Sequence, residues 1–176
     1  MRGICFSFAL LANAVLAYSQ SGPPRPTVFQ PWPEEPTEFR GIKFGSTESQ
    51  ARAVANIQQC RDVRSDRFCV WAVPVKDFSF TVFLIFVDGK FASATGTFPQ
   101  DRFADVRSLF VRTYGRPHTS AAMEMQYQEI GWMGKGAEVS LKATGGPEGS
   151  GHFSVETAEY SKKSMRDQDA KQAGRK

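Results

Sequence analysis

Two runs of alternating residues around Asp88-Gly89 limit the fold more than any other part of the chain. Residues 78–87 and 91–98 are rich in β-branched and aromatic residues, and Asp-Gly is a common hairpin turn, so the runs are expected to pair as antiparallel strands. A two-residue turn would place Val82 opposite Thr95, whereas a three-residue loop with a left-handed Gly89 places Val82 opposite Ala94. We favour the second register because it separates apolar from hydroxyl side chains. The expected apolar face contains Phe80, Val82, Leu84, Ala92, Ala94 and Gly96, and the hydroxyl face contains Ser79, Thr81, Thr95 and Thr97.

The segment from Pro99 to Tyr114 has the pattern of an amphipathic helix. Apolar residues recur at helical spacing, Gly115 supplies a left-handed cap and Pro117 prevents continuation. Since an apolar stripe has to be covered, we expect this helix to pack on the apolar face of the hairpin. The residues expected to be buried against one another are Phe103, Val106 and Phe110 of the helix and Phe80, Val82 and Leu84 of the hairpin.

Weaker patterns place the other elements. Residues 39–45 indicate a short strand, and Thr47 and Gln50 form a capping-box pattern at the start of a helix of about three turns. Further strands are expected over residues 68–73, 122–132, 137–142 and 152–160. The sequence therefore predicts a single α+β domain over residues 39–160, built of two halves that each consist of a helix and an antiparallel meander. Both helices are expected to pack on one face of the antiparallel sheet.

The N-terminal segment has the pattern of a secretory signal peptide. Arg2 precedes an apolar run, and Val15-Leu16-Ala17 is a small-residue cleavage signal. The apolar stretch has about 14 residues, fewer than the roughly 20 that a membrane-spanning helix needs, and no later segment approaches that length. We therefore assign residues 1–19 to a signal peptide that is cleaved after Ala17 or Ser19. The expected product is periplasmic or secreted and has no transmembrane segment.

Two cysteines remain after removal of the signal peptide, because Cys5 lies within its apolar run. Cys60 and Cys69 enclose eight residues, and an even count in an exported chain favours a disulfide. A structural zinc needs four donors, and neither His118 nor His152 lies at ligand spacing from a cysteine. The sequence therefore predicts a Cys60–Cys69 disulfide and neither a metal nor another cofactor.

Prolines are concentrated between Pro23 and Pro36, where six of the ten occur. This composition favours extended polyproline geometry and excludes a helix, so residues 20–38 are interpreted as an extended arm. The alternative is a proline-rich ligand for a partner, with Phe29 and Trp32 as its anchors.

The net charge of +4 lies in the C-terminal tail. Residues 161–176 hold six basic and two acidic residues, whereas residues 18–160 hold 15 basic and 16 acidic ones. A near-neutral body argues against nucleic acid as a partner. The tail lacks apolar periodicity, so we expect a disordered or frayed helical segment that makes weak contact with anionic surfaces.

Catalytic motifs are missing from the sequence. It contains no phosphate-binding glycine loop, dinucleotide fingerprint or histidine-metal spacing. Ser150-Gly151-His152 is discounted as a catalytic pair, because neighbouring residues on a turn are expected to point apart. The acidic residues are scattered singly along the elements, so none is nominated as half of a catalytic carboxylate pair.

Two groups of residues are candidates for contact with a partner. Arg61, Arg64 and Arg67 recur every three residues between the two cysteines, where they could meet an anionic partner. Asp62 and Asp66 interleave with them, so a charge-balanced, solvated loop is the alternative. The second group is expected at one end of the hydroxyl face, as an apolar contact site or as a second small core. Its members are Phe83, Ile85 and Phe91.

Four motifs resemble those of a group of small uncharacterised exported proteins of Gram-negative bacteria: FRGIKFG before a capped helix, VDGKF at a hairpin, VRTYGRP closing the second helix, and GWMG ending a later strand. The resemblance covers about residues 39–160, and its turn and cap signatures bear on fold more than on function. More distantly, the predicted architecture resembles that of β-lactamase inhibitor proteins and the small lipoprotein of outer-membrane protein assembly. That family has two helices before its strands, and its lipoproteins carry a lipidation cysteine. This chain departs on both counts, so neither activity is carried over.

These observations favour an exported, non-catalytic binding or envelope-associated protein, whose partner is a protein or another envelope component. The alternative is an inhibitor of an extracellular or periplasmic enzyme, with the segment between Cys60 and Cys69 as the inserting element. A hydrolase is the third hypothesis. It requires a pocket that holds two close carboxylates or a Ser/His pair.

Overall fold

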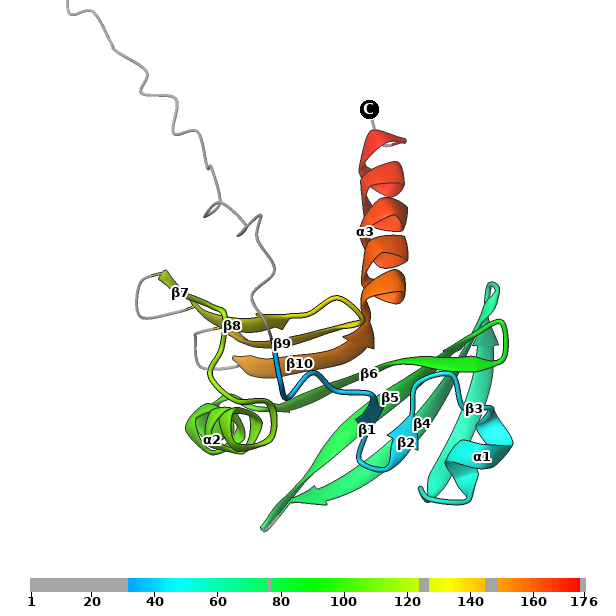
Figure 1. Ribbon diagram of the computed structural model, residues 1–176, viewed down its shortest axis with the longest axis horizontal. Coiled ribbons are helices and arrows are strands. Elements are labelled where there is room, and N and C mark those ends of the chain that lie inside the picture. The colour runs from blue at the N-terminus through cyan, green and yellow to red at the C-terminus, as the bar shows by residue number, and fades with distance from the viewer. Residues whose placement is uncertain (1–31, 76, 124–126, 145–148, 175–176) are drawn as a thin grey trace, which may run out of the picture.

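The computed structural model describes residues 32–75, 77–123, 127–144 and 149–174, and Figure 1 shows how their elements are arranged. An eight-stranded antiparallel sheet dominates the fold. Its strands are β3 (Ile57–Val63), β4 (Asp66–Val75), β5 (Phe78–Val87), β6 (Lys90–Pro99), β7 (Thr119–Met123), β8 (Tyr127–Met133), β9 (Ala137–Thr144) and β10 (Ser150–Thr157). The smaller elements are the ribbon strands β1 (Glu38–Phe39) and β2 (Ile42–Lys43), the helices α1 (Glu48–Arg52), α2 (Phe103–Tyr114) and α3 (Ala158–Ala173), and a 3₁₀ turn at Gln100–Arg102.

The large sheet consists of two meanders joined along their last strands. The strand order is β3-β4-β5-β6-β10-β9-β8-β7, so β6 of the first meander pairs with β10 of the second. This pairing runs from Ser150 opposite Pro99 to Glu156 opposite Ser93. Both meanders therefore belong to one continuous sheet, whose edges are β3 and β7.

The predicted α+β fold of two helix-and-meander halves is wrong, because the structure is β-rich. Each meander has four strands rather than three, and α1 has only five residues instead of about three turns. The additional strand of the first meander is residues 57–63, which pair with β4 and place Cys60 directly opposite Cys69. The helices also do not share one face. Figure 1 shows α1 and α2 on one side of the sheet and α3 on the other.

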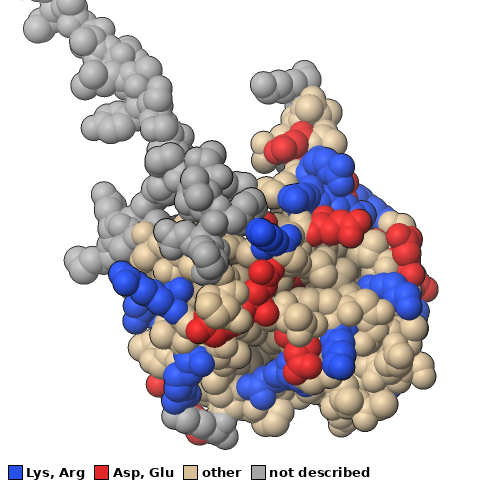
Figure 2. Space-filling model, in the orientation of Figure 1, with Lys and Arg blue, Asp and Glu red and all other residues tan. Residues whose placement is uncertain are grey.

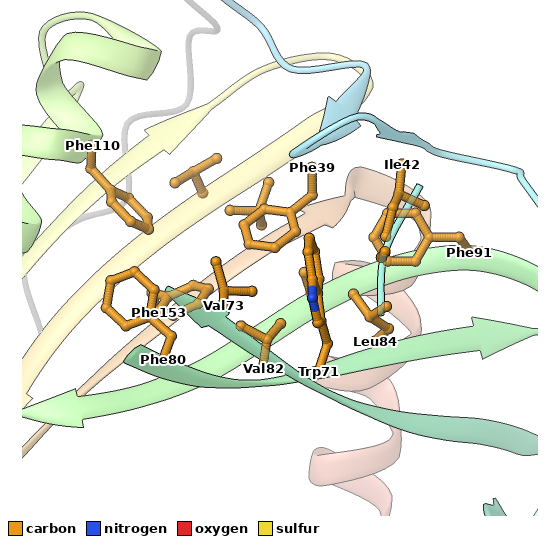
Figure 3. Packing of buried hydrophobic residues seen from close by; sticks show 14 of the residues in the cluster. Phe39, Ile42, Trp71, Val73, Phe80, Val82, Leu84, Phe91, Phe110 and Phe153 are labelled. Atoms are coloured by element: carbon orange, nitrogen blue, oxygen red, sulfur yellow. The ribbon is translucent and has the colours of Figure 1, made fainter. Parts of the chain in front are cut away.

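The core lies between the sheet and the layer formed by α1, α2 and the β1-β2 ribbon (Figure 3). The expected burial of Val106 and Phe110 is confirmed, and Phe103 is partly buried. The ring of Phe110 contacts Phe153 of β10 at a centroid distance of 5.5 Å, and Phe153 contacts Phe80 at 5.1 Å. A residue from the second meander therefore lies between α2 and the β5–β6 hairpin.

The β5–β6 hairpin forms as expected, but its turn differs. Asp88 and Gly89 both have positive φ, 50° and 74°, as in a two-residue turn that matches the twist of the strands. The register then shifts next to Phe86, where Ala92 is the extra residue. Such a β-bulge reverses the side-chain alternation of one strand relative to its partner.

The bulge changes the predicted register but preserves the two faces over residues 93–97. Val82 lies opposite Gly96 rather than Ala94, and Leu84 lies opposite Ala94. Thr81 lies opposite Thr97 on the other face. The predicted register is thus wrong by two residues, and a displacement of two residues leaves the side chains of residues 93–97 on their expected faces. Phe91 lies beyond the bulge and is on the core face instead.

The described end of the proline-rich arm packs on the domain. Trp32 is buried, its indole Nε1 donates a hydrogen bond to the carbonyl of Tyr114 at 2.8 Å, and its ring meets His118 edge-on. Trp32 is therefore an anchor within this chain rather than an exposed anchor for a partner. Phe29 and the expected signal peptide, residues 1–19, lie outside the described residues.

The C-terminal tail is helical where the structure describes it, so of the two expected states, disordered or frayed helical, it has the helical one there. The side chain of Thr157 caps α3 by accepting a hydrogen bond from the backbone of Tyr160, and the first turn buries Ala158 and Ser161. This docked and capped first turn is the physical reason that the helix forms despite its weak apolar stripe. Beyond it α3 projects away from the sheet (Figure 1). No helix among the described residues is long and apolar enough to cross a membrane.

Candidate functional site

A cleft opens between residues 34–40 and α2. Its volume is about 580 Å³, within the range of small-ligand sites. Figure 2 shows the face that carries the ribbon and α2, which is hollowed among charged side chains of both signs. The floor of the cleft is aromatic and consists of Phe39, Phe80, Phe110, Tyr114 and Phe153. Its exposed rim includes Glu34, Glu38, Arg40 and Thr113.

The wall formed by residues 34–40 is fixed at both ends. At one end lies the Trp32 anchor, and beside it the carboxylate of Glu35 accepts hydrogen bonds from the backbone N–H groups of Gly136 and Ala137. At the other end the backbone N–H of Phe44 donates to the carbonyl of Thr37 at 3.0 Å. The cleft is therefore preformed, which lowers the entropy that binding has to offset.

Tyr114 is the polar group at the floor of this cleft. It is only 7% exposed, and burial raises its pKa to about 12, an effect that the nearby Arg40 guanidinium opposes. No hydrogen bond joins its hydroxyl to any other residue in the described part of the chain. Among the described residues, Gln100 Oε1 is the one fully buried side-chain polar atom without a partner, so the Tyr114 hydroxyl is not sealed from the surface. It can therefore donate a hydrogen bond to a ligand or accept one from it.

The second candidate region is the disulfide-bonded hairpin of β3 and β4. The predicted Cys60–Cys69 disulfide is present, with the two Cα atoms 4.0 Å apart on paired strands. The enclosed residues are therefore two strands and a turn rather than a loop. Arg64 lies in the turn with a φ of 59°.

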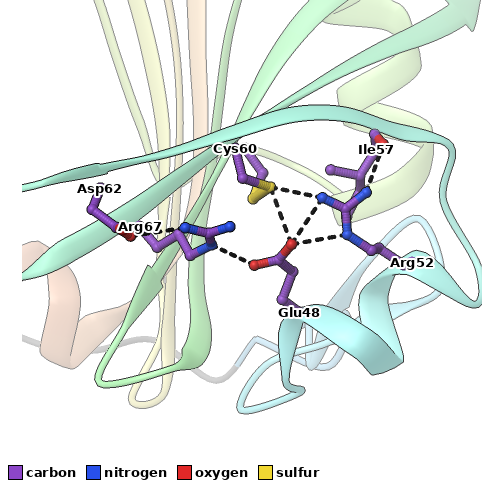
Figure 4. Close-up of polar contacts among 7 residues, drawn as sticks. Glu48, Arg52, Ile57, Cys60, Asp62 and Arg67 are labelled. Atoms are coloured by element: carbon purple, nitrogen blue, oxygen red, sulfur yellow. Dashed lines mark hydrogen bonds and ion pairs between the residues drawn. A yellow bond between two sulfur atoms is a disulfide. The ribbon is translucent and has the colours of Figure 1, made fainter.

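A network of charged side chains surrounds the disulfide (Figure 4). The carboxylate of Glu48 accepts hydrogen bonds from Arg52 Nε at 2.8 Å and from Arg67 Nε, and Arg67 also contacts Asp62 at 3.0 Å. The hydrogen bond from Arg67 is the main reason that the pKa of Glu48 lies below its usual value. Arg52 Nη2 lies 3.1 Å from the sulfur of Cys60. The network joins α1 to the hairpin.

The oxygen of Glu48 and the sulfurs of Cys60 and Cys69 lie within 4.8 Å of one another. Both sulfurs belong to the disulfide, so this group offers no thiolate to a metal ion.

The three candidate arginines are not brought together. Arg67 lies on the face of the hairpin that carries the disulfide, where it binds Glu48. Arg61 alternates with Cys60 along β3 and therefore lies on the opposite face, paired across the strands with Phe68. With Arg64 in the turn, the hairpin has no single arginine-rich surface.

The candidate apolar group is also divided. Phe91 is buried in the main core, where it stacks on Phe44 at a centroid distance of 5.4 Å. Ile85 is buried and Phe83 is half-buried on the other face of the sheet. The bulge at Ala92 causes this division, because it places Phe91 on the core face.

A pair of carboxylates lies on the sheet face opposite the cleft, and sequence analysis missed it. Glu138 of β9 and Glu156 of β10 are direct cross-strand partners. Ser161 of α3 donates a hydrogen bond to Glu138 at 2.7 Å, and Ser93 of β6 contacts Glu156 at 3.4 Å. Burial raises the pKa of Glu156, and the charge of Glu138 adds to the effect. The alternation of polar and apolar residues along β9 and β10 indicates that Glu138 and Glu156 both lie on polar faces. Only the pairing of the two strands shows that these carboxylates are neighbours.

Ser150 and His152 also contact each other, so the prediction that they point apart is wrong. Ser150 Oγ lies 2.8 Å from His152 Nε2, because residues two apart on a strand share a face. Both side chains lie outside the cleft, and within the described residues no hydrogen bond orients the other ring nitrogen of His152. The contact therefore lacks the third group that a nucleophile and base require.

No protein-family model, curated protein or solved structure matches the chain. The resemblance to small exported proteins of Gram-negative bacteria therefore stays a prediction.

Proposed function

We propose that the protein is an exported, non-catalytic binding protein of the bacterial envelope, and that its partner binds in the cleft between residues 34–40 and α2. The observation that carries the proposal is Tyr114, a buried residue of the aromatic floor whose hydroxyl makes no hydrogen bond to the described residues. Large aromatic surfaces with one or a few polar groups are typical of binding sites.

The disulfide supports an oxidising compartment. The distribution of polar side chains supports binding over catalysis. The Glu138/Glu156 pair and the Ser150/His152 contact lie outside the cleft, so neither supplies it with a nucleophile or a general base. The titratable side chains at the rim are instead exposed charges of both signs, suited to contact with a polar partner.

A crosslinking experiment tests the proposal in living cells. A benzophenone amino acid at Thr113, on the rim of the cleft, is expected to give one discrete crosslinked product. The matched control carries the same group at Ala104, which is exposed on α2 but outside the cleft. Substitution Tyr114→Phe in the Thr113 variant removes only the hydroxyl and should reduce the product. Equal products from the two positions, or no effect of Tyr114→Phe, would contradict the proposal.

A second candidate function is inhibition of an extracellular or periplasmic enzyme through the β3–β4 hairpin. The favouring observation is that the disulfide and the Glu48 network brace a hairpin whose turn residues, Arg64 and Ser65, are exposed. Pre-organised hairpins bind with little loss of chain entropy. A benzophenone group at Ser65 distinguishes the two functions. If the hairpin binds an enzyme, the Ser65 variant gives a crosslinked product and the Thr113 variant does not.

A further inference from the structure

The base of α3 rests on the carboxylate pair of the sheet. Glu138 and Glu156 are adjacent on paired strands, and the first turn of α3 covers them. The hydroxyl of Ser161, a buried residue of that turn, donates to Glu138 at 2.7 Å. Glu138 lies between Ala137 and Val139, which face the core, so its side chain and that of Glu156 belong to the face that α3 occupies.

Charged and polar groups face this pair from each neighbouring element. Ser93 of β6 contacts Glu156, and Lys142 of β9 acts on it from a distance while pairing with Glu129 of β8 at 2.9 Å. Tyr160 and Ser161 approach from α3. Asp66 of β4 binds Lys163 of α3 at 3.0 Å, which is a second tie between the helix and the sheet. Lys163 also lies 3.7 Å from Asp167 one turn later.

Two carboxylates at neighbouring positions of a sheet repel each other when both are ionised, and burial beneath a helix increases the repulsion. A proton on Glu156 removes one of the two charges and leaves Glu138 free to accept the hydrogen bond from Ser161. When α3 leaves the sheet, water reaches both carboxylates and the repulsion is screened.

We propose that Glu138 and Glu156 form a pH-sensitive latch, which holds α3 against the sheet when Glu156 is protonated and releases it when both carboxylates are ionised. The docked helix thus binds one proton more than the released helix in the pH range above the ordinary titration of a glutamate. Docking therefore strengthens as the pH falls toward about 4.5 and weakens as it rises. The latch belongs to the face opposite the cleft and does not depend on the proposed binding function.

Hydrogen exchange of the α3 amides tests the latch on the mature chain. After correction for the chemical exchange rate, protection of residues 158–173 should fall as the pH rises from 5 to 8. Each unit by which docking raises the Glu156 pKa permits up to about a tenfold change in the docked-to-released ratio. Glu156→Gln cannot ionise, so α3 should remain protected across the whole range. Asp169→Asn, at an exposed position of the same helix, should behave as the wild type.

Two results would overturn the latch: protection that does not change with pH, or a Glu156→Gln variant that keeps the wild-type pH dependence. If Glu156→Gln does not fold, the carboxyl carbon of Glu156 in the wild type decides by NMR. The proposal requires this carbon to titrate together with the α3 amide resonances and above the range of an exposed glutamate. Independent titration of the two signals contradicts it.

Discussion

The indole of Trp32 donates a hydrogen bond to the backbone carbonyl of Tyr114, 82 residues later in the chain. The bond fixes the segment before β1 to the end of α2, and the two rings meet edge-on at 6.5 Å. One anchor thus positions both walls of the cleft. The Tyr114 carbonyl would lose this partner if the indole were replaced.

We expect Trp32→Phe to lower the free energy of unfolding by about 1–3 kcal/mol, because it removes the donor and leaves a buried carbonyl unpaired. Equilibrium denaturation in urea measures the change. Val54→Ala is the control, since Val54 is 57% exposed, and it should alter stability by no more than about 0.5 kcal/mol. Equal stability of the Trp32→Phe and control variants would show that the arm is not anchored.

Phe110→Ala should destabilise the fold by about 3–5 kcal/mol, because the side chain is buried among Phe153, Trp132 and Tyr114. The loss would be a large share of the stability of a small domain. Arg107→Ala, at an exposed position of the same helix, is the matched control. A loss below about 1 kcal/mol at Phe110 would mean that α2 does not cover the core.

The β5–β6 hairpin shows how far the sequence determines the sheet. Alternation of side chains identified both strands and both faces, because burial acts on each residue separately. The register depended on where one extra residue is placed, and a three-residue loop and a bulge at Ala92 both satisfy the pattern. Local sequence did not distinguish them, so the position of Phe91 was predicted on the wrong face.

Other contacts could not be predicted from the sequence because they depend on elements that are far apart in the chain. The Glu138/Glu156 pair depends on β9 lying beside β10, and the Arg67–Glu48 contact depends on β4 lying near the start of α1. Neither arrangement has a signal in local periodicity. The Cys60–Cys69 bond was predictable because the argument needed only the expected export of the chain and its count of cysteines.

The disulfide gives a direct test of export and of its contribution to stability. Unreduced protein isolated from the periplasm should have no free thiol in its mature region, as measured by mass after alkylation. Replacing both cysteines with serine should cost about 2–3 kcal/mol, the loop entropy of a ring of about ten residues. In a reducing agent the wild type should approach the stability of the double variant. Two free thiols in the periplasmic protein would contradict the assignment.

Glu48 should make stability depend on pH in the acidic range. Its pKa is lowered in the folded state, chiefly by Arg67, so its contribution is present above the ordinary value of 4.5 and is lost as the pH falls through the lower, folded value. Glu48→Gln should therefore be less stable than the wild type at pH 7, and the difference should vanish in strong acid. Thermal unfolding at several pH values measures this. Asp169→Asn serves as the control, and a difference that persists unchanged in acid would mean that the loss is not electrostatic.

The exposed basic residues of α3 are expected to carry any attraction to anionic surfaces. Lys162, Arg166 and Lys171 are exposed, whereas Ser161 and Lys163 contact the sheet. Replacing the three exposed residues with glutamine therefore changes the charge of α3 and keeps its contacts with the sheet. Deletion of residues 161–176 would remove those contacts as well. Binding to vesicles rich in anionic lipid should weaken in the variant, and binding of the wild type should weaken with added salt.

The melting temperatures of the wild type and the triple variant should nearly coincide, because the three residues are exposed and lie beyond the first turn of α3. The matched comparison is a triple variant in which glutamine replaces Lys43, Arg61 and Arg64. These residues are also exposed, and their replacement removes the same charge from another part of the surface. Weaker binding by both variants would indicate net charge alone as the cause. Weaker binding by the α3 variant only would locate the contact on the helix, and unchanged binding by that variant would exclude it.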